Sequence, residues 1–340
     1  MESGDTQSAE LSVNSVADST IIANGQWQTI SIPISNFTAS TFDLSATTVA
    51  MSFFPSYQTG ENLIYQLDNA RFELGDGNPG GGNGGGNGTA SAINSDKWFH
   101  QTQLPNGNSW FNGEQQHYTN RTENSYVSNG TLKIVAIKEP FTDQNVTKQY
   151  TSARLNSKYA FTYGRVEVRA KLPSGGGTWP AIWTLGKNIS ETGAYWQTQG
   201  FGTTSWPACG EIDIMEHWGD NQNYVQSAMH TPSSHGGTAN HGGQNISTAS
   251  TAFHVYSMEW SEDEIIFAVD GVEHYRYDPA NKNADTWPFD APQYLLMNFA
   301  IESDIAASFS EAQMEVDYVR IYDIDADPST DDPLWSDEFN

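Results

Sequence analysis

The chain has 340 residues, which is enough for one sizeable domain and a smaller appendage. Its 41 acidic residues outnumber 15 lysines and arginines, and the formal net charge of −26 argues against nucleic acid or an anionic membrane as a partner. No apolar run approaches the roughly 18 residues of a membrane span, and residues 1–10 lack a signal-peptide core. We therefore expect a secreted, extracellular protein whose leader was removed or lies outside this sequence.

The leading segment, residues 1–74, contains stretches with strand character at 26–37, 47–55 and 63–74. They resemble the closing strands of a jelly-roll carbohydrate-binding module, although the segment is short for a complete one. A sugar-binding role and a truncated or structural appendage both stay open. Residues 75–91 are rich in glycine and asparagine, which predicts a flexible linker to the next domain.

Strand signals dominate the main domain, predicted at 92–323. Residues 131–138, 164–172, 264–277 and 314–322 alternate or are rich in β-branched and aromatic side chains. The dipeptide Asp270-Gly271 is typical of a hairpin turn, and no long segment shows a helical period. The sequence predicts an all-β chain. Its single cysteine, Cys209, excludes an internal disulfide and is expected to be a small packed hydrophobic residue.

Three acids lie in residues 210–219, which read GEIDIMEHWG. Side chains alternate along a strand, so Glu211 and Asp213 point to one face while Glu216 would point to the other. A β-bulge near Ile214 would return Glu216 to the shared face. Because Ile212 and Ile214 make the opposite face a core face, we expect a catalytic row of acids rather than a solvated acidic edge.

Aromatic residues are dense around these acids. Four indoles, from Trp179, Trp183, Trp206 and Trp218, lie within about forty residues of them. Flat aromatic rings bury the apolar faces of sugars well, although each of the four could equally be a core residue. The pattern favours a polysaccharide cleft.

These motifs, together with residues 109–119, 163–173, 178–186 and 316–323, resemble glycoside hydrolase family 16 and, within it, the laminarinases. The resemblance implies a β-jelly-roll sandwich with an open concave-face substrate cleft, beside the small N-terminal β segment. It also implies a retaining mechanism in which Glu211 is the nucleophile, Asp213 the helper acid and Glu216 the general acid/base. The positions that match cleft-lining residues of the family are Asn112, Arg154, Trp179, Trp183, Trp206 and His230.

The resemblance further implies a structural calcium ion away from the cleft and no organic cofactor. Its ligands match Asp317 and the backbone oxygens of Gly130 and Glu338, and carboxylate and carbonyl oxygens are the donors that calcium prefers. The alternative is that Asp317 only forms a salt bridge.

The end of the sequence is unusual. Residues 334–340, after a predicted linker at 324–333, resemble the opening strand of a family 16 domain, yet they come last. We infer a circular permutation, because domain termini usually lie close together. Residues 334–340 should then pair with the catalytic sandwich, within one chain or by strand exchange between chains.

The leading hypothesis is an endo-acting hydrolase that cleaves internal β-1,3 bonds of β-glucan. A mixed-linkage β-glucan or a marine galactan is the alternative substrate within the family. A non-catalytic polysaccharide-binding protein is the alternative from another class, and the intact set of three acids argues against it.

Overall fold

The structure, a computed structural model, describes residues 2–3, 6–7, 47–49 and 90–339. The chain divides into two units, Met1–Gly77 and Asn78–Asn340. In the first, β1 (Glu2–Ser3) pairs with β2 (Thr6–Gln7) and with β3 (Thr47–Val49). The strands expected at 26–37 and 63–74 lie outside the described residues. The likeness of this segment to a carbohydrate-binding module therefore stays a prediction.

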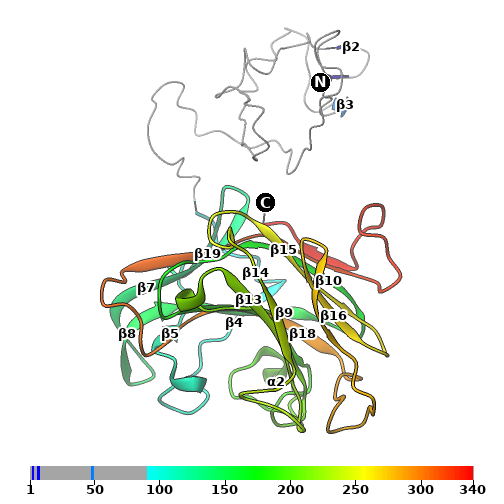
Figure 1. The fold of residues 1–340 in the computed structure, drawn as a ribbon. Coiled ribbons are helices and arrows are strands. Elements are labelled where there is room, and N and C mark those ends of the chain that lie inside the picture. Colours follow the sequence, from blue (N-terminus) through cyan, green and yellow to red (C-terminus); the bar gives the residue numbers. More distant parts are fainter. Residues whose placement is uncertain (1, 4–5, 8–46, 50–89, 340) are drawn as a thin grey trace. The chain divides into compact units, whose positions relative to one another are not determined.

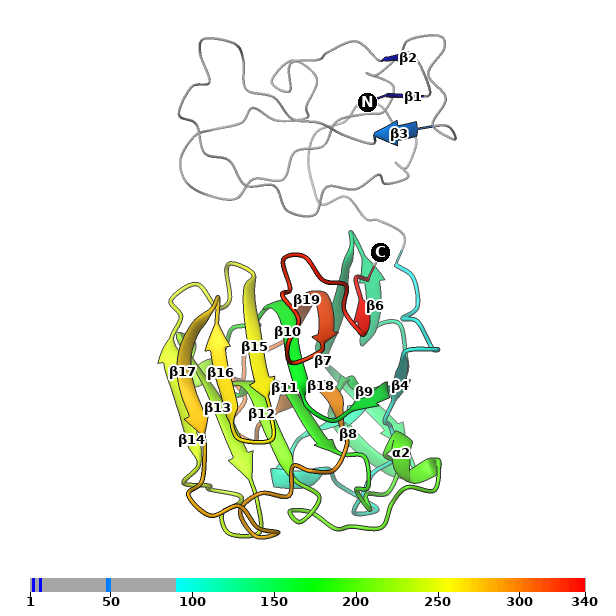
Figure 2. The same ribbon diagram turned by 90° about the vertical axis from the view of Figure 1, so that its right-hand side faces the viewer.

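The second unit is built on two large sheets (Figures 1 and 2). The ten-stranded sheet runs in the order β17-β16-β15-β10-β19-β7-β8-β5, with β20 paired to β19 and β6 to β7. Its pairs are antiparallel except for β5 with β8. The strands are β5 (Gln116–Tyr118), β6 (Ser125–Ser128), β7 (Thr131–Asp143), β8 (Val146–Ser152), β10 (Gly164–Lys171), β15 (His254–Trp260), β16 (Ile265–Val269), β17 (Val272–Tyr277), β19 (Glu311–Tyr322) and β20 (Trp335–Asp337).

The seven-stranded sheet runs in the order β14-β13-β12-β11-β18-β9-β4 and is antiparallel throughout. Its strands are β4 (Trp98–His100), β9 (Arg154–Phe161), β11 (Thr178–Gly186), β12 (Glu211–His217), β13 (Tyr224–His230), β14 (His241–Asn245) and β18 (Gln293–Ile301). The short helical turns of this unit are η3 (Phe111–Gly113), α2 (Tyr195–Thr198) and η4 (Gly219–Asn221).

The main core lies between these two sheets. It combines the inward side chains of both, such as Val166 and Val168 of β10 with Ile212 and Met215 of β12. A second buried cluster covers the opposite face of the seven-stranded sheet and includes Cys209, which is buried as expected. The architecture confirms the predicted all-β jelly-roll sandwich.

The predicted strands are also confirmed. Residues 131–138, 164–172 and 314–322 correspond to β7, β10 and β19. Residues 264–277 form the hairpin of β16 and β17, whose turn residues Asp270 and Gly271 both have positive φ, 50° and 76°. Both central residues of a type I′ hairpin turn need positive φ, which explains the Asp-Gly pair.

The last strand, β20, completes an edge of the larger sheet. β7 pairs with residues 311–316 of β19, and β20 pairs with Val319–Ile321, beyond the residues that pair with the beginning of β7. The expected pairing of residues 334–340 with the sandwich is therefore found for Trp335–Asp337, within one chain. A permuted origin of the chain and strand exchange between chains stay predictions.

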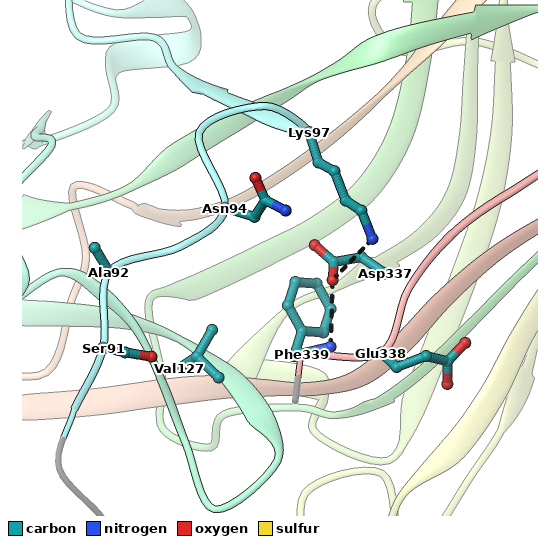
Figure 3. A pocket seen from close by; sticks show the side chains of 8 residues that line it. All are labelled: Ser91, Ala92, Asn94, Lys97, Val127, Asp337, Glu338 and Phe339. Carbon is teal, nitrogen blue, oxygen red and sulfur yellow. Dashed lines mark hydrogen bonds and ion pairs between the residues drawn. The ribbon is translucent and has the colours of Figure 1, made fainter.

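Side chains from outside the larger sheet also hold β20 in place, and Figure 3 shows one of them, Lys97, beside Asp337. The Trp98 indole N–H donates to Asp337 Oδ2 at 2.8 Å, and Lys97 Nζ donates to the Ser336 carbonyl at 2.6 Å. The Trp98 and Trp335 rings meet edge to face at 5.5 Å. A cavity of about 400 Å³ beside this contact is lined by Lys97, Asp337 and their neighbours.

Among the described residues, no helix is both long and apolar enough to span a membrane.

Candidate active site

A bulge in β12 brings the three acids to one face. Along β11 the register passes from Met215 opposite Ile182 to Asp213 opposite Trp183, so Ile214 is the extra residue. Without this residue, strict alternation would send Glu216 into the core. Ile212, Ile214 and Met215 instead contribute to the main core, while Glu211, Asp213 and Glu216 share the outer face. The bulge lies where the sequence predicts it.

Glycines flank this strand at both ends. Gly210 has a φ of 76°, a conformation that favours glycine. At Gly219 a Cβ would overlap the carbonyl oxygen of Gly175, so only glycine lets these two segments meet. The two glycines of the motif therefore fix how β12 begins and how the chain leaves it.

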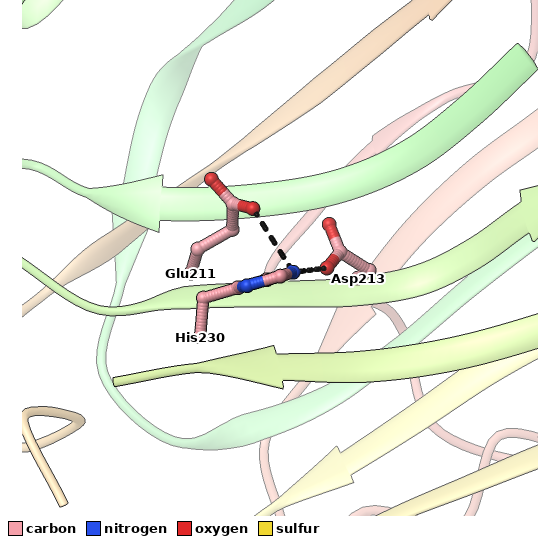
Figure 4. A group of neighbouring side chains, drawn as sticks. All are labelled: Glu211, Asp213 and His230. Carbon is pink, nitrogen blue, oxygen red and sulfur yellow. Dashed lines mark ion pairs between the residues drawn. The ribbon is translucent and has the colours of Figure 1, made fainter. Parts of the chain in front are cut away.

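Three nitrogen-bearing side chains lie against the acids, and Figure 4 shows one of them, His230. His230, opposite Glu211 on β13, places its Nε2 atom 3.5 Å from Glu211 Oε1 and 3.1 Å from Asp213 Oδ2. The Trp206 indole N–H donates to Glu211 Oε2 at 3.1 Å, and that of Trp179 donates to Glu216 Oε1 at 3.2 Å. Two of the predicted sugar-binding indoles thus also hold the acids.

Burial raises the pKa of all three acids, and the charge of Asp213 adds to the rise for Glu211 and Glu216. The pKa of Glu216 is raised to about 8, first by burial and second by the charge of Asp213, while His230 and the Trp179 N–H oppose the rise. Burial raises the pKa of Asp213 to about 8. The pKa of Glu211 lies well above its usual value, through burial first and the charge of Asp213 second. The row therefore holds protons at neutral pH.

Hydrogen bonding indicates where the shared proton of Glu211 and Asp213 lies. Glu211 accepts a hydrogen bond from Trp206 at 3.1 Å, and a donor of this kind favours the ionised form. Asp213 Oδ2 is buried and accepts no hydrogen bond from any described residue, although His230 Nε2 lies 3.1 Å away. Because the two groups titrate as a pair, this asymmetry favours a charged Glu211 beside a protonated Asp213.

A buried polar chain supports the indole of Trp183. Its N–H donates to Asn298 Oδ1 at 2.7 Å, and the Asn298 amide donates to the Tyr118 hydroxyl at 3.0 Å. That hydroxyl donates to Glu114 Oε2 at 2.8 Å. The Asn298 side chain is thus hydrogen-bonded at both its oxygen and its nitrogen, and Glu114 supports Trp183 through Tyr118 and Asn298.

Arg154 lies beneath the same indole. Its side chain is 3% exposed, and its guanidinium donates to Glu191 at 2.9 Å and to Gln101 at 3.0 Å. The guanidinium carbon lies 4.8 Å from the Trp183 ring centroid. Arg154 therefore supports the face of Trp183 and is itself largely shielded from solvent.

The other expected residues lie at different depths. Asn112 is exposed on η3 with a φ of 52°, whereas Trp206 is 41% exposed and Trp179 stacks on Trp218 with ring centroids 5.9 Å apart. His217 is buried and bonds the Gln222 carbonyl at 2.7 Å, which excludes it from the outer face.

Sequence reasoning missed Gln226, whose side chain hydrogen-bonds Glu216. Gln226 lies opposite Glu216 on β13 and four positions before His230. Alternation along β13 from His230 would have placed it on the same face, so the signal was present in the sequence.

The residues expected at a calcium site have other partners. Asp317 Oδ2 lies 2.5 Å from Arg169 Nη1, which is the salt bridge considered as the alternative. The Glu338 carboxylate pairs with Arg320, and Gly130 lies in the turn between β6 and β7. A calcium ion here would share the Asp317 carboxylate with Arg169 and take carbonyl oxygens from the other two residues.

Two groups of acids and histidine in the described residues are close enough to hold a metal ion. One is the set of Glu211, Asp213 and His230 itself. The other is the exposed cluster of Asp220, Glu302 and Asp304, where burial and the two neighbouring acids raise the pKa of Glu302. An acidic cluster alone does not define a metal centre, and none is assigned.

Together the two-sheet sandwich and the row of carboxylates define a glycoside hydrolase. Residues 112–320 match Glycosyl hydrolases family 16, and the chain belongs to this family. A β-glucanase of Rhodothermus marinus is 42% identical over 233 residues, which cover 64% of this chain and 76% of that protein.

Solved structures agree with this assignment. The chain is 48% identical to a LamA variant from Z. galactanivorans in complex with laminaritriose and laminaritetraose, with a TM-score of 0.63. That match covers 68% of this chain and 94% of the other. SCLam, a non-specific endo-β-1,3(4)-glucanase, is 35% identical with a TM-score of 0.61, covering 68% of this chain and 86% of that one.

Proposed function

We propose that this protein is an endo-1,3-β-glucanase that hydrolyses laminarin-type β-glucan with retention of configuration. The observation that carries the proposal is the bulged strand with three carboxylates on one face beside half-exposed indoles. The solved relative in complex with laminari-oligosaccharides supports the choice of β-1,3-linked substrate. A polymeric substrate of this size does not cross membranes, which supports action outside the cell.

In the first step Glu211 attacks the anomeric carbon. The glycosidic C–O bond breaks as the new carboxylate ester forms, and Glu216 gives its proton to the departing glucosyl oxygen. The raised pKa of Glu216, about 8, keeps that proton available at neutral pH. The Trp206 N–H helps to hold Glu211 in the ionised form that attack requires.

In the second step a water molecule attacks the same carbon. Glu216, now ionised, takes a proton from the water while the bond to Glu211 breaks and the sugar leaves with its original configuration. Protonated Asp213 beside Glu211 limits the negative charge in the row when Glu211 departs as a carboxylate. The indoles of Trp179, Trp183 and Trp206 offer apolar faces for glucosyl rings.

The proposal is tested by product analysis on laminarin, lichenan, agarose and carrageenan, with anomeric configuration followed by NMR. We expect short oligosaccharides from laminarin, released first as the β-anomer. An α-anomeric first product would overturn the mechanism, and no cleavage of laminarin would overturn the substrate. Similarity to the β-1,3(4)-glucanase SCLam makes cleavage of lichenan the second candidate activity.

Replacing Trp179 with phenylalanine should shift the alkaline limb of the pH profile upward. Activity requires a protonated Glu216, so kcat/KM falls as the pH rises through its pKa, about 8. The Trp179 N–H stabilises the ionised form of Glu216, and its loss raises the pKa. Trp218→Phe, which alters the stacking partner of Trp179, is the control. An unchanged limb in Trp179→Phe would show that this hydrogen bond does not set the Glu216 pKa.

We further propose a structural calcium ion bound by Asp317 and the carbonyls of Gly130 and Glu338. A ligand that binds only the folded state raises its stability, so a chelator should lower the Tm by several degrees. Initial rates at low temperature should stay unchanged, because the proposed ligands lie outside the acid row. Asp317→Asn is the comparison, since its Tm should not respond to the chelator. An equal Tm of the parent protein with and without chelator would refute the site.

A further inference from the structure

The bulge in β12 faces a single residue of the neighbouring strand. Along β13, Asp213 lies opposite Ala228 and Glu216 opposite Gln226, so Ile214 and Met215 together face Ser227. A bulge disrupts the regular ladder of backbone hydrogen bonds. The Ser227 hydroxyl donates to the Ile214 carbonyl at 2.8 Å, and Ser227 is fully buried. A side chain thus bonds the backbone of the extra residue.

His274, from the other sheet, fixes that hydroxyl. Its Nε2 atom lies 2.9 Å from Ser227 Oγ. The hydroxyl has one hydrogen, which points to Ile214, so Nε2 must carry the hydrogen and donate to Ser227. His274 Nδ1 is then an acceptor, and it is buried without a hydrogen-bond partner among the described residues. Burial lowers the pKa of His274 to about 4, which keeps the ring neutral in this arrangement.

We propose that Ser227 and His274 are positioning residues that lock the β12 bulge and so hold Glu216 in register with Glu211. The inference rests on the proposed function, because it concerns the geometry of that acid pair. The bulge directly precedes Glu216 in the chain, because only Ile214 and Met215 lie between Asp213 and Glu216. Gln226, which hydrogen-bonds Glu216, is the residue before Ser227 on β13.

Ser157 provides a matched control. It is also fully buried in the seven-stranded sheet, and it lies at the irregular register between β9 and β18. Its hydroxyl donates to the Tyr159 carbonyl at 2.7 Å and accepts from the Leu295 N–H at 2.9 Å. Ser157→Ala therefore removes the same kind of backbone support on strands that carry none of the three acids.

The test compares Ser227→Ala with Ser157→Ala on laminarin. Misplacement of a catalytic group by about 1 Å can cost ~100-fold in rate, so we expect kcat of Ser227→Ala to fall about 10- to 100-fold. KM should change by less than about threefold, because the indoles are untouched. The alkaline limb should move upward, since a displaced Glu216 loses the donors that lower its pKa. Ser157→Ala should lose stability but keep kcat and the pH limb.

A second pair of variants keeps the inference testable if Ser227→Ala does not fold. His274→Leu removes the donor to Ser227, whereas His274→Gln retains an N–H near the position of Nε2. We expect His274→Leu to lower kcat and His274→Gln to recover most of it. Equal kcat values in both variants and the parent, or equal losses in Ser227→Ala and Ser157→Ala, would overturn the positioning role. Failure of the parent protein to cleave laminarin would instead refute the proposed function.

Discussion

Glu211→Ser is expected to abolish hydrolysis of laminarin while leaving the fold intact. Loss of a catalytic nucleophile typically lowers kcat by about 10⁴-fold or more, and serine at this position is too short to attack the same carbon. The Glu211 side chain lies on the outer face of β12 and contributes nothing to the core between the sheets. Hydrolysis rates and the circular dichroism spectrum of the variant check both parts of the prediction.

The matched control is Glu259→Ser, which removes a half-exposed carboxylate from the other sheet. Its activity should equal that of the parent protein. Added azide provides a further test, since a small nucleophile can enter the space that Glu211 vacates. An activated β-glycoside should then yield the α-glycosyl azide. Full turnover by Glu211→Ser without azide would exclude Glu211 as the nucleophile.

Glu216→Gln should have the second largest effect, and its size should depend on the leaving group. Glutamine cannot donate the proton that the glucosyl oxygen needs, so cleavage of laminarin should fall by about 10²- to 10⁴-fold. A substrate with a dinitrophenyl leaving group needs no proton, and its first step should be nearly unchanged. The fall of activity that we expect above pH 8 in the parent protein should disappear for this substrate.

Burst kinetics distinguish this outcome from a general loss of structure. With the dinitrophenyl substrate, the first step stays fast while water attack lacks its base, so the glycosyl-enzyme should accumulate. The expected record is a rapid release of dinitrophenolate followed by a slow steady state. An equal loss in the rate of the first step for both substrates, with no burst of dinitrophenolate, would exclude Glu216 as the general acid.

The sequence carried enough information to predict the catalytic strand. Ile212 and Ile214 mark the core face, and three acids at positions 211, 213 and 216 fit one outer face only if one residue is extra. The strands β7, β10 and β19 followed from alternation in the same way. These features depend on local chemistry, because a residue's face in a strand is set by its immediate neighbours in sequence.

Contacts between distant segments could not be predicted in this way. Nothing near Trp183 in the sequence indicates that its indole bonds Asn298, which lies 115 residues away. The same holds for Ser227 and His274, which come from different sheets. Such contacts depend on strand order and sheet packing, and a local pattern does not encode either. The burial of Arg154 is another example, because it depends on contacts with Glu191 and Gln101, which are distant in the sequence.

The attachment of β20 has a consequence for how the chain folds. The hydrogen bond between Trp98 and Asp337 joins positions 239 residues apart and connects the edge strand β4 of one sheet to β20 of the other. Closing so long a loop costs chain entropy that no local contact offsets. This corner should therefore assemble late during refolding and separate early during denaturation, so that Trp98 fluorescence would report the last step of assembly.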